Sequence, residues 1–92
     1  MRNGYMSNIF DLCAKYFTKQ SQVRKLIEEC LELSLELMNS PGIITKDDEG
    51  VISEIADVEI MIQQIKHTFN LYTAVADVKE QKLERIKSRI NA

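Results

Sequence analysis

The stretch KQSQVRKLIEECLELSLELMNSPG, residues 19–42, decides the fold class of this 92-residue chain. Drawn at 100° per residue, it places its glutamates in one sector of a helix and most of its apolar residues in the other. Residues 39–41, Asn-Ser-Pro, favour the end of a helix. The pattern predicts an amphipathic helix that begins at Lys19 or Ser21 and ends at Met38.

Three further helices are expected from apolar periodicity, and they cover residues 7–17, 47–69 and 73–90. Ser7 is the expected N-cap of the first, and Thr45 or Asp47 caps the next. The last helix carries its bases towards its C-terminus, where cations are favoured. Because alternation of apolar and polar residues is never sustained, strands have little support. The prediction is a single all-α domain over residues 1–92, with four helices and an antiparallel central pair.

Composition excludes several classes of protein. A net charge of −2 argues against a broadly basic nucleic-acid binder. No apolar run approaches the length of a membrane span, and the first residues lack the apolar stretch of a signal peptide. Cys13 and Cys30 form no CxxC pair and lack zinc-ligand spacing, so two buried free thiols in a reducing compartment are expected. We expect a cytoplasmic protein without a nucleic acid or membrane partner.

The negative charge is concentrated in the centre of the chain, where residues 28–59 hold ten acids and one base. Glu29 and Glu32 are i,i+3 neighbours on one expected helix, and Glu54 and Asp57 repeat that spacing on the next. Like charges so placed destabilise a helix by a few tenths of a kcal/mol. Two antiparallel helices could gather the four carboxylates around one point, and oxygen ligands suit Mg²⁺ or Mn²⁺. Two solvated acidic faces would give the same pattern, so the residues alone leave both interpretations open.

These acids and their flanks resemble a known family. The segments EECLEL (residues 28–33) and EIADV (residues 54–58) are similar to the ExxE…ExxD signature of MazG-like nucleoside triphosphate pyrophosphohydrolases, which have an all-α fold. The resemblance covers nearly the whole chain. It implies a four-helix MazG-like unit that assembles into a homodimer or homotetramer. The implied activity is Mg²⁺-dependent hydrolysis of an NTP or dNTP to the monophosphate and pyrophosphate, as nucleotide-pool house-cleaning.

The resemblance also implies roles for seven residues. The metal ligands would be Glu29, Glu32, Glu54 and Asp57, with Mn²⁺ as a possible substitute for Mg²⁺. Glu28 would be an adjacent acid that helps to activate water, and the cations Lys82 and Arg89 of the last helix would meet the phosphates. The general chemistry agrees, because triphosphate hydrolysis needs charge neutralisation and an in-line water more than covalent chemistry.

Three alternatives stay open. The first is an enzyme like the phosphoribosyl-ATP pyrophosphohydrolases, which share the acids. The second is a non-catalytic helical dimerisation or interaction module whose acid stripes face solvent or a basic partner. The third is a member of the fold that has lost activity and serves as a binding or regulatory subunit. All four motif acids are present, which favours an active enzyme over the last of these.

Two further expectations concern apolar residues. The second helix has apolar residues on two sides, with Leu31, Leu35 and Met38 apart from Leu26, Leu33 and Leu37. Since one partner helix covers only about 100° of stripe, an oligomer is expected. Phe10 and Phe17 are the aromatic residues best placed to reach a nucleobase, if the first helix covers the site.

Overall fold

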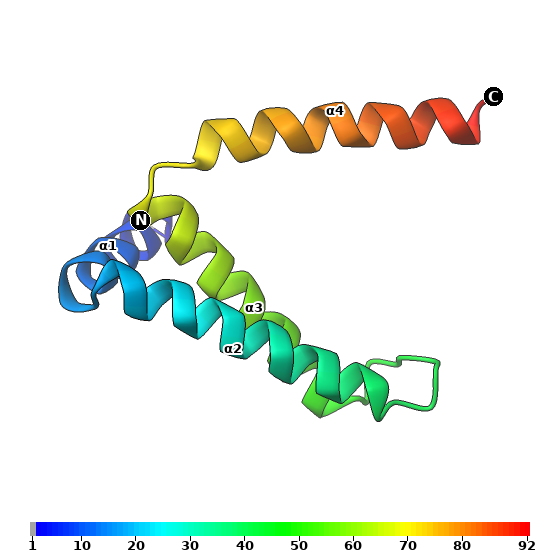
Figure 1. Ribbon diagram of the computed structural model, residues 1–92, viewed down its shortest axis with the longest axis horizontal. Helices are drawn as coiled ribbons and strands as arrows, with labels where there is room; N and C mark the ends of the chain where they lie inside the picture. Colours follow the sequence, from blue (N-terminus) through cyan, green and yellow to red (C-terminus); the bar gives the residue numbers. More distant parts are fainter. Residues whose placement is uncertain (1) are drawn as a thin grey trace.

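The computed structural model describes the backbone of residues 2–92 and the side chains of residues 9–92. It consists of α1 (Arg2–Tyr16), α2 (Lys19–Met38), α3 (Glu49–Thr68) and α4 (Tyr72–Ile90), and the described backbone contains no strand (Figure 1). The all-α, four-helix prediction is confirmed. The bounds of the last three helices agree with it within two residues, whereas α1 begins before Ser7, whose side chain lies outside the described residues. None of the described helices is both long and apolar enough to cross a lipid bilayer.

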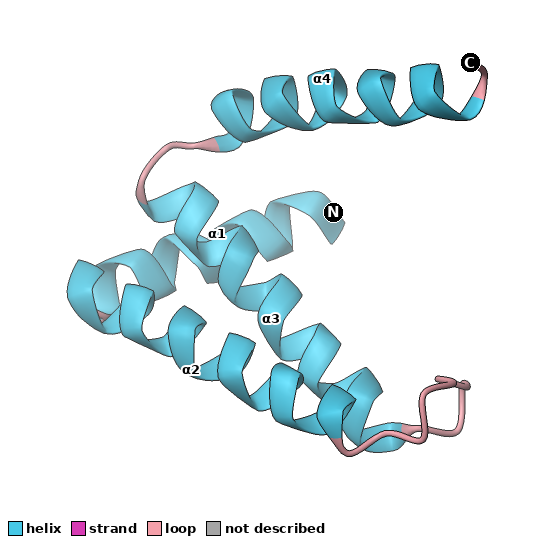
Figure 2. Ribbon diagram, turned by 45° about the vertical axis from the view of Figure 1, so that its right-hand side comes forward, coloured by secondary structure: helices cyan, strands magenta, loops and turns pink. Residues whose placement is uncertain are grey.

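α2 and α3 form an antiparallel hairpin, as predicted (Figures 1 and 2). α2 begins after Thr18, whose Oγ1 accepts a hydrogen bond of 3.0 Å from the Ser21 N–H and so caps the helix. It ends at Asn39, whose N–H donates to the Leu35 carbonyl. The following loop turns at Gly42, whose φ of 94° lies in the region that favours glycine. The hairpin brings the two acid-bearing helices together.

The start of α3 differs from the sequence prediction. Asp48 is the N-cap residue, and its side chain makes no capping hydrogen bond. Its Oδ2 instead accepts a hydrogen bond of 2.8 Å from the Thr45 N–H, and Thr45 Oγ1 accepts one from the Asp47 N–H. Thr45 and Asp47 were therefore wrong as caps, because these polar groups close the turn that precedes the helix.

Residues 69–71, which we call the elbow, direct α4 away from the hairpin (Figures 1 and 2). Asn70 has a φ of 55°, and the Leu71 N–H donates to the Lys66 carbonyl at 2.8 Å, a closure typical of a Schellman helix end. Gln63 Nε2 donates to Tyr72 Oη at 3.1 Å, and the Lys66 ammonium lies 5.7 Å from the Tyr72 ring centre. These contacts hold the first turn of α4 against α3, and the rest of α4 runs clear of the hairpin.

The single chain has little apolar core. Among the described side chains, the buried apolar ones are Phe10 and Val51, whereas Gln22, Glu29 and Gln64 are buried polar residues. The radius of gyration is 16.0 Å, compared with about 12 Å for a compact domain of this length. The buried centre of the molecule is thus polar, and much of its apolar surface faces outwards.

The two cysteines are free, as predicted, but the expected burial is wrong. Cys30 is exposed on α2, and Cys13 is half-buried on α1. Cys30 lies about 100° around α2 from the buried Glu29. It therefore lies beside the face of α2 that α3 covers, in contact with solvent.

Candidate metal and substrate site

Three of the four predicted ligand acids meet between α2 and α3, and we call them the acid triad. Glu29 comes from the middle of α2, and Glu54 and Asp57 come from successive turns of α3. Each offers one carboxylate oxygen, and these oxygens lie within 4.8 Å of one another. Oxygens that share one Mg²⁺ lie at most about 4.2 Å apart, since each is about 2.1 Å from the ion. A small closing movement of the side chains would bring them to that spacing.

The acid triad is partly withdrawn from water and incompletely hydrogen-bonded. Glu29 is only 4% exposed, and Lys25 Nζ pairs with its Oε1 at 3.0 Å. Glu29 Oε2 and Glu54 Oε2 are buried and have no hydrogen-bond partner among the described residues. Such orphaned carboxylate oxygens are costly unless something compensates them. An all-oxygen, negatively charged and partly unpartnered donor set fits a hard divalent cation such as Mg²⁺.

Crowding of negative charge changes the acid–base behaviour of the site. Burial raises the pKa of Glu54 above its ordinary value of 4.5, and the charges of Glu32, Glu29 and Asp57 raise it further. The hydrogen bond to Glu29 and the charge of that carboxylate raise the pKa of Lys25. Ionising Glu54 in the folded protein is therefore unfavourable when no cation is present beyond Lys25.

We expect the metal-free Glu54→Gln variant to be more stable than the unchanged protein at neutral pH but not in acid. Folding raises the pKa of Glu54. Below its unfolded pKa, Glu54 is therefore protonated in both the folded and the unfolded protein, and it does not lower the stability of the fold there. The penalty develops as pH rises from about 4.5 through the folded pKa, and it is fully present above that value. Thermal melts of both proteins at a series of pH values in a metal chelator measure this difference. A difference that shrinks as pH rises would contradict the assignment of strain to Glu54.

Glu28 and Glu32 lie at the rim of the acid triad rather than in it. Both are exposed on α2, and Glu32 is not among the three clustered acids. Glu32 still influences the site, because its charge contributes to the raised pKa of Glu54. At 100° per residue it is turned about 60° from Glu29, which moves it from the helix interface to the edge. The structure thus brings together three of the four predicted ligands.

Lys82 and Arg89, the predicted phosphate-binding cations, are exposed on α4. Because α4 meets α3 near the elbow and then runs clear of the hairpin, both lie apart from the acid triad of their own chain (Figure 1). Among the described side chains, Lys25 is the cation that forms an ion pair with the triad. The sequence motif did not single out Lys25.

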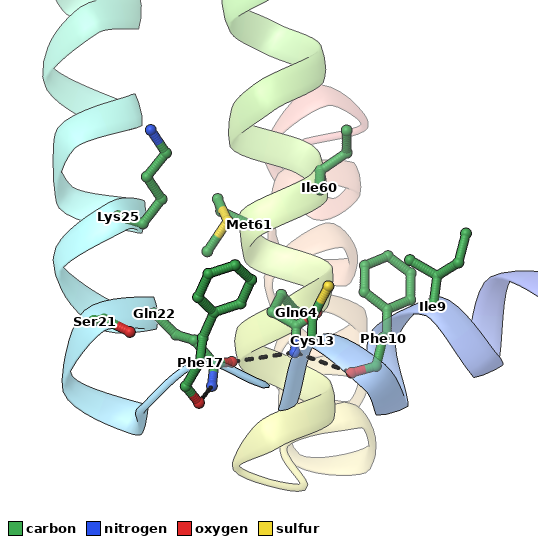
Figure 3. A pocket seen from close by; sticks show the side chains of 10 residues that line it. All are labelled: Ile9, Phe10, Cys13, Phe17, Ser21, Gln22, Lys25, Ile60, Met61 and Gln64. Carbon is green, nitrogen blue, oxygen red and sulfur yellow. Dashed lines mark hydrogen bonds between the residues drawn. The ribbon is translucent and has the colours of Figure 1, made fainter. Parts of the chain in front are cut away.

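An apolar cavity of about 380 Å³ adjoins the acid triad, between α1, α2 and α3 (Figure 3). Lys25 in its wall also contacts Glu29, and Met61 follows Asp57 by one turn of α3. The cavity and the triad therefore share a boundary. The side chains that line the cavity are Ile9, Phe10, Cys13, Phe17, Ser21, Gln22, Lys25, Ile60, Met61 and Gln64.

Two buried glutamines tie α1 to the hairpin beside this cavity, as Figure 3 shows. Gln64 Nε2 lies 3.2 Å from the Phe10 carbonyl oxygen and 3.1 Å from Gln22 Oε1. Gln22 Nε2 in turn donates to the Phe17 carbonyl at 3.1 Å. The two hydrogen bonds to main-chain carbonyls hold Phe10 of α1 and Phe17, which follows α1, at the cavity.

Sequence analysis did not identify this glutamine pair, although a signal was present. Gln22 precedes Glu29 by seven residues, and Gln64 follows Asp57 by seven. Seven residues are close to two helical turns, so each glutamine lies on the same face as a triad acid. A polar residue on a face already predicted to be inward would have indicated a buried network.

No protein-family model, curated protein or solved structure matches this chain.

Proposed function

We propose that this protein is a Mg²⁺-dependent nucleoside triphosphate pyrophosphohydrolase, which splits an NTP or dNTP into the monophosphate and pyrophosphate. The observation that carries the proposal is a pair of buried oxygens of Glu29 and Glu54 in a three-carboxylate cluster, for which the described residues offer no hydrogen-bond partner. The cluster stands directly beside an apolar cavity. A site that needs a cation and adjoins an aromatic-lined cavity suits a substrate with a polyphosphate and a flat ring.

The acid triad would hold the metal ion, with Glu32 at the rim as a further acid. When bound, Mg²⁺ or Mn²⁺ supplies polarisation of phosphoryl oxygens and a lowered pKa of a coordinated water. Glu28 and Glu32 are exposed at the rim, so either carboxylate can take up a proton from water on that side. Lys25 keeps a positive charge beside Glu29, where negatively charged phosphates would approach.

The apolar cavity would take the nucleobase. Its volume of about 380 Å³ lies within the usual range of small-molecule sites. Phe10 and Phe17 offer aromatic surface, against which a flat heterocycle can stack. The glutamine pair fixes both residues through their carbonyl oxygens, so α1 would act as a fixed wall of the base site.

The proposed enzyme acts as a homodimer or homotetramer in the cytoplasm, where nucleotide pools are found. Oligomer formation is supported by apolar side chains that a single chain leaves in water. On α3 these include Ile52, Ile55 and Ile62, which are each more than a third exposed. Burial of such residues is the main favourable term in association.

A helical interaction module is the second candidate function. The exposed apolar residues of α2 and α4 favour it, since they would also serve a purely structural assembly. It differs from the enzyme in one testable respect, because a module has no need for an orphaned carboxylate pair to bind an ion.

The test of the proposed activity is a screen of the purified protein against canonical and modified NTPs and dNTPs with Mg²⁺. Detection of pyrophosphate and of the matching monophosphate distinguishes this reaction from release of inorganic phosphate. Nucleoside diphosphates serve as the control substrates, since their hydrolysis to the monophosphate releases inorganic phosphate and not pyrophosphate. Absence of turnover with every triphosphate, in protein shown to bind Mg²⁺, would favour the interaction module.

Millimolar Mg²⁺ is expected to raise the melting temperature of the protein. Binding to the folded state alone adds about 2.7 kcal/mol at a hundredfold excess over Kd. For a domain of this size that corresponds to a rise of roughly 10–20 °C. Differential scanning fluorimetry with Mg²⁺, Mn²⁺ and NaCl of equal ionic strength measures the effect. The rise should vanish in a Glu54→Gln/Asp57→Asn double variant, and a rise of equal size in NaCl would contradict a specific site.

A further inference from the structure

Two apolar stripes on different helices are exposed to solvent. The first, which we call the α2 stripe, consists of Ile27, Leu31, Leu35 and Met38, and Leu31 is 60% exposed. The second, the α4 stripe, consists of Leu83, Ile86 and Ile90, and Leu83 is 61% exposed. A helix in a protein gains most of its stability from packing of its apolar face, so we expect both stripes to be buried against another surface.

The area of exposed surface indicates that the cover is another chain. The chain exposes 7636 Å², whereas a folded monomer of 10.6 kDa is expected to expose about 5,500 Å². The excess of roughly 2,000 Å² on each of two chains falls within the 2,000–5,000 Å² total that obligate homodimers bury. One dimer interface of ordinary size for such proteins would therefore remove it.

The elbow prevents the α4 stripe from being covered by the chain's own hairpin. The hydrogen bond from the Leu71 N–H to the Lys66 carbonyl and the one from Gln63 to Tyr72 fix the direction in which α4 leaves α3. Its stripe is thus available to a second copy.

Charge on the edges of the two stripes selects how they meet. On α2, Glu28 and Glu32 lie about 60–100° to one side of the stripe, and on α4, Lys82 and Arg89 lie about 60–100° to the opposite side. Viewed along each helix from its N-terminus, the acids and the bases lie on opposite sides of their stripes. When the two stripes face each other, such opposite edges meet only if the helices run in the same direction. A parallel pair therefore sets acids against bases, whereas an antiparallel pair separates them.

The lengths of the two helical faces also agree in this orientation. The α2 stripe spans residues 27–38, and the α4 stripe, extended by the aliphatic stem of Lys79, spans residues 79–90. Both cover eleven steps along a helix. Figures 1 and 2 show α4 running in the same sense as α2, so a two-fold axis along that shared direction keeps α4 parallel to α2 of the partner.

We propose that the protein forms a reciprocal dimer in which α4 of each copy lies parallel on the α2 stripe of the other. Leu83 and Ile86 pack against Leu31 and Leu35 of the second copy. The Lys82 and Arg89 edge faces the Glu28 and Glu32 edge of that copy.

This dimer would complete the candidate site with residues from a second copy. Glu28 and Glu32 lie at the rim of the acid triad, so the arriving Lys82 stands at the rim of the partner's triad, and Arg89 lies about two turns further along the same edge. Cations that are remote within one chain become neighbours of the acids between chains. Their contact with phosphates rests on the proposed function, whereas the dimer itself does not.

Site-specific photocrosslinking tests the docking directly. A benzophenone amino acid replaces Leu83 in the full chain, or Ile90 should the first substitution disturb packing, and Gln81 on the opposite side of α4 serves as the control position. We expect a product of twice 10.6 kDa whose crosslinked peptide joins α4 to residues 19–38 of another chain. A crosslink within one chain, a crosslink between two copies of α4, or equal yield from position 81 would overturn the proposal.

Charge reversal provides an independent test that does not depend on the crosslinker. Glu28→Lys/Glu32→Lys and Lys82→Glu/Arg89→Glu are each expected to weaken dimerisation at least tenfold, and the chain with all four changes should regain most of the loss. Glu59→Lys/Arg85→Glu is the matched control and should change little, because Arg85 lies on the side of α4 away from the stripe. Sedimentation equilibrium gives the dissociation constants, and circular dichroism checks that each variant is helical. A helical quadruple variant that stays as weak as its parents would overturn the proposed pairing.

These readouts keep the dimer separate from the enzyme. Mass and crosslink position involve neither metal nor nucleotide. A dimer without hydrolysis would leave the docking intact and remove the proposed activity. Hydrolysis by a chain that remains at 10.6 kDa would do the reverse.

Discussion

Glu54→Gln is expected to remove nearly all Mg²⁺-dependent pyrophosphate release while raising the melting temperature of the metal-free protein. The carboxylate is crowded by Glu29, Glu32 and Asp57, and one of its oxygens is buried and has no partner within the described part of the chain. Removing its charge relieves repulsion in the absence of metal but takes an oxygen ligand from the ion. Since even residues that only support metal ligands typically change activity 10–100-fold, loss of a ligand should cost about 100-fold or more. Glu29→Gln and Asp57→Asn should lose activity to a similar extent.

Glu36→Gln is the matched control for these variants. Glu36 is an exposed glutamate on α2, the helix that carries Glu29, and it lies outside the acid triad. Its replacement should leave both pyrophosphate release and the metal-free melting temperature near their original values. Glu32→Gln should fall between the two groups, because Glu32 acts on the site from its rim. An active Glu54→Gln variant beside an inactive Glu36→Gln variant would show that the acid triad is not the metal site.

Gln64→Leu is expected to destabilise the fold strongly, by about 2–4 kcal/mol. Gln64 is 3% exposed, and its amide nitrogen lies within hydrogen-bond distance of the Phe10 carbonyl, Gln22 and Thr68. A leucine fills the space but leaves buried acceptors without a donor, and each orphaned group costs about 1–3 kcal/mol. The corresponding fall in melting temperature is roughly 10 °C or more for a domain of this size.

The neighbouring Gln63→Leu variant separates this network from a general intolerance of leucine. Gln63 is half-buried and donates one hydrogen bond, to Tyr72. Its replacement should cost about 1 kcal/mol, the usual net value of one such bond. Chemical denaturation of both variants gives the comparison. Equal stability of the Gln64 and Gln63 variants would mean that the buried glutamine pair does not hold α1 to the hairpin.

The helices and the meeting of Glu29 with Glu54 and Asp57 could be predicted from the sequence. Helical periodicity states which residues share a face, and a short connection between two amphipathic helices makes them antiparallel. Those two facts alone bring the acids of residues 29 and 54 towards one another. Glu32 shows the limit of the argument, since a difference of about 60° on a helix separates a buried interface from its rim.

The direction of α4 could not be predicted in the same way. Periodicity identifies the apolar face of residues 72–90, but the partner of that face depends on the φ of Asn70 and on side-chain contacts of Tyr72. For the same reason the sequence placed Lys82 and Arg89 near the acids without indicating that α4 leaves its own hairpin. The capping groups at Thr45 and Asp47 failed because the same polar groups can close a turn or cap a helix.

The elbow has a kinetic consequence for assembly. Hydrogen bonds at the elbow set the direction of α4 before two chains meet. Association therefore costs little conformational entropy at the elbow. Two chains would then recognise each other as preformed surfaces rather than by folding of one segment upon the other. Loosening the elbow with Tyr72→Ala should slow association more than it speeds dissociation, because α4 would have to reach its docking orientation during each encounter.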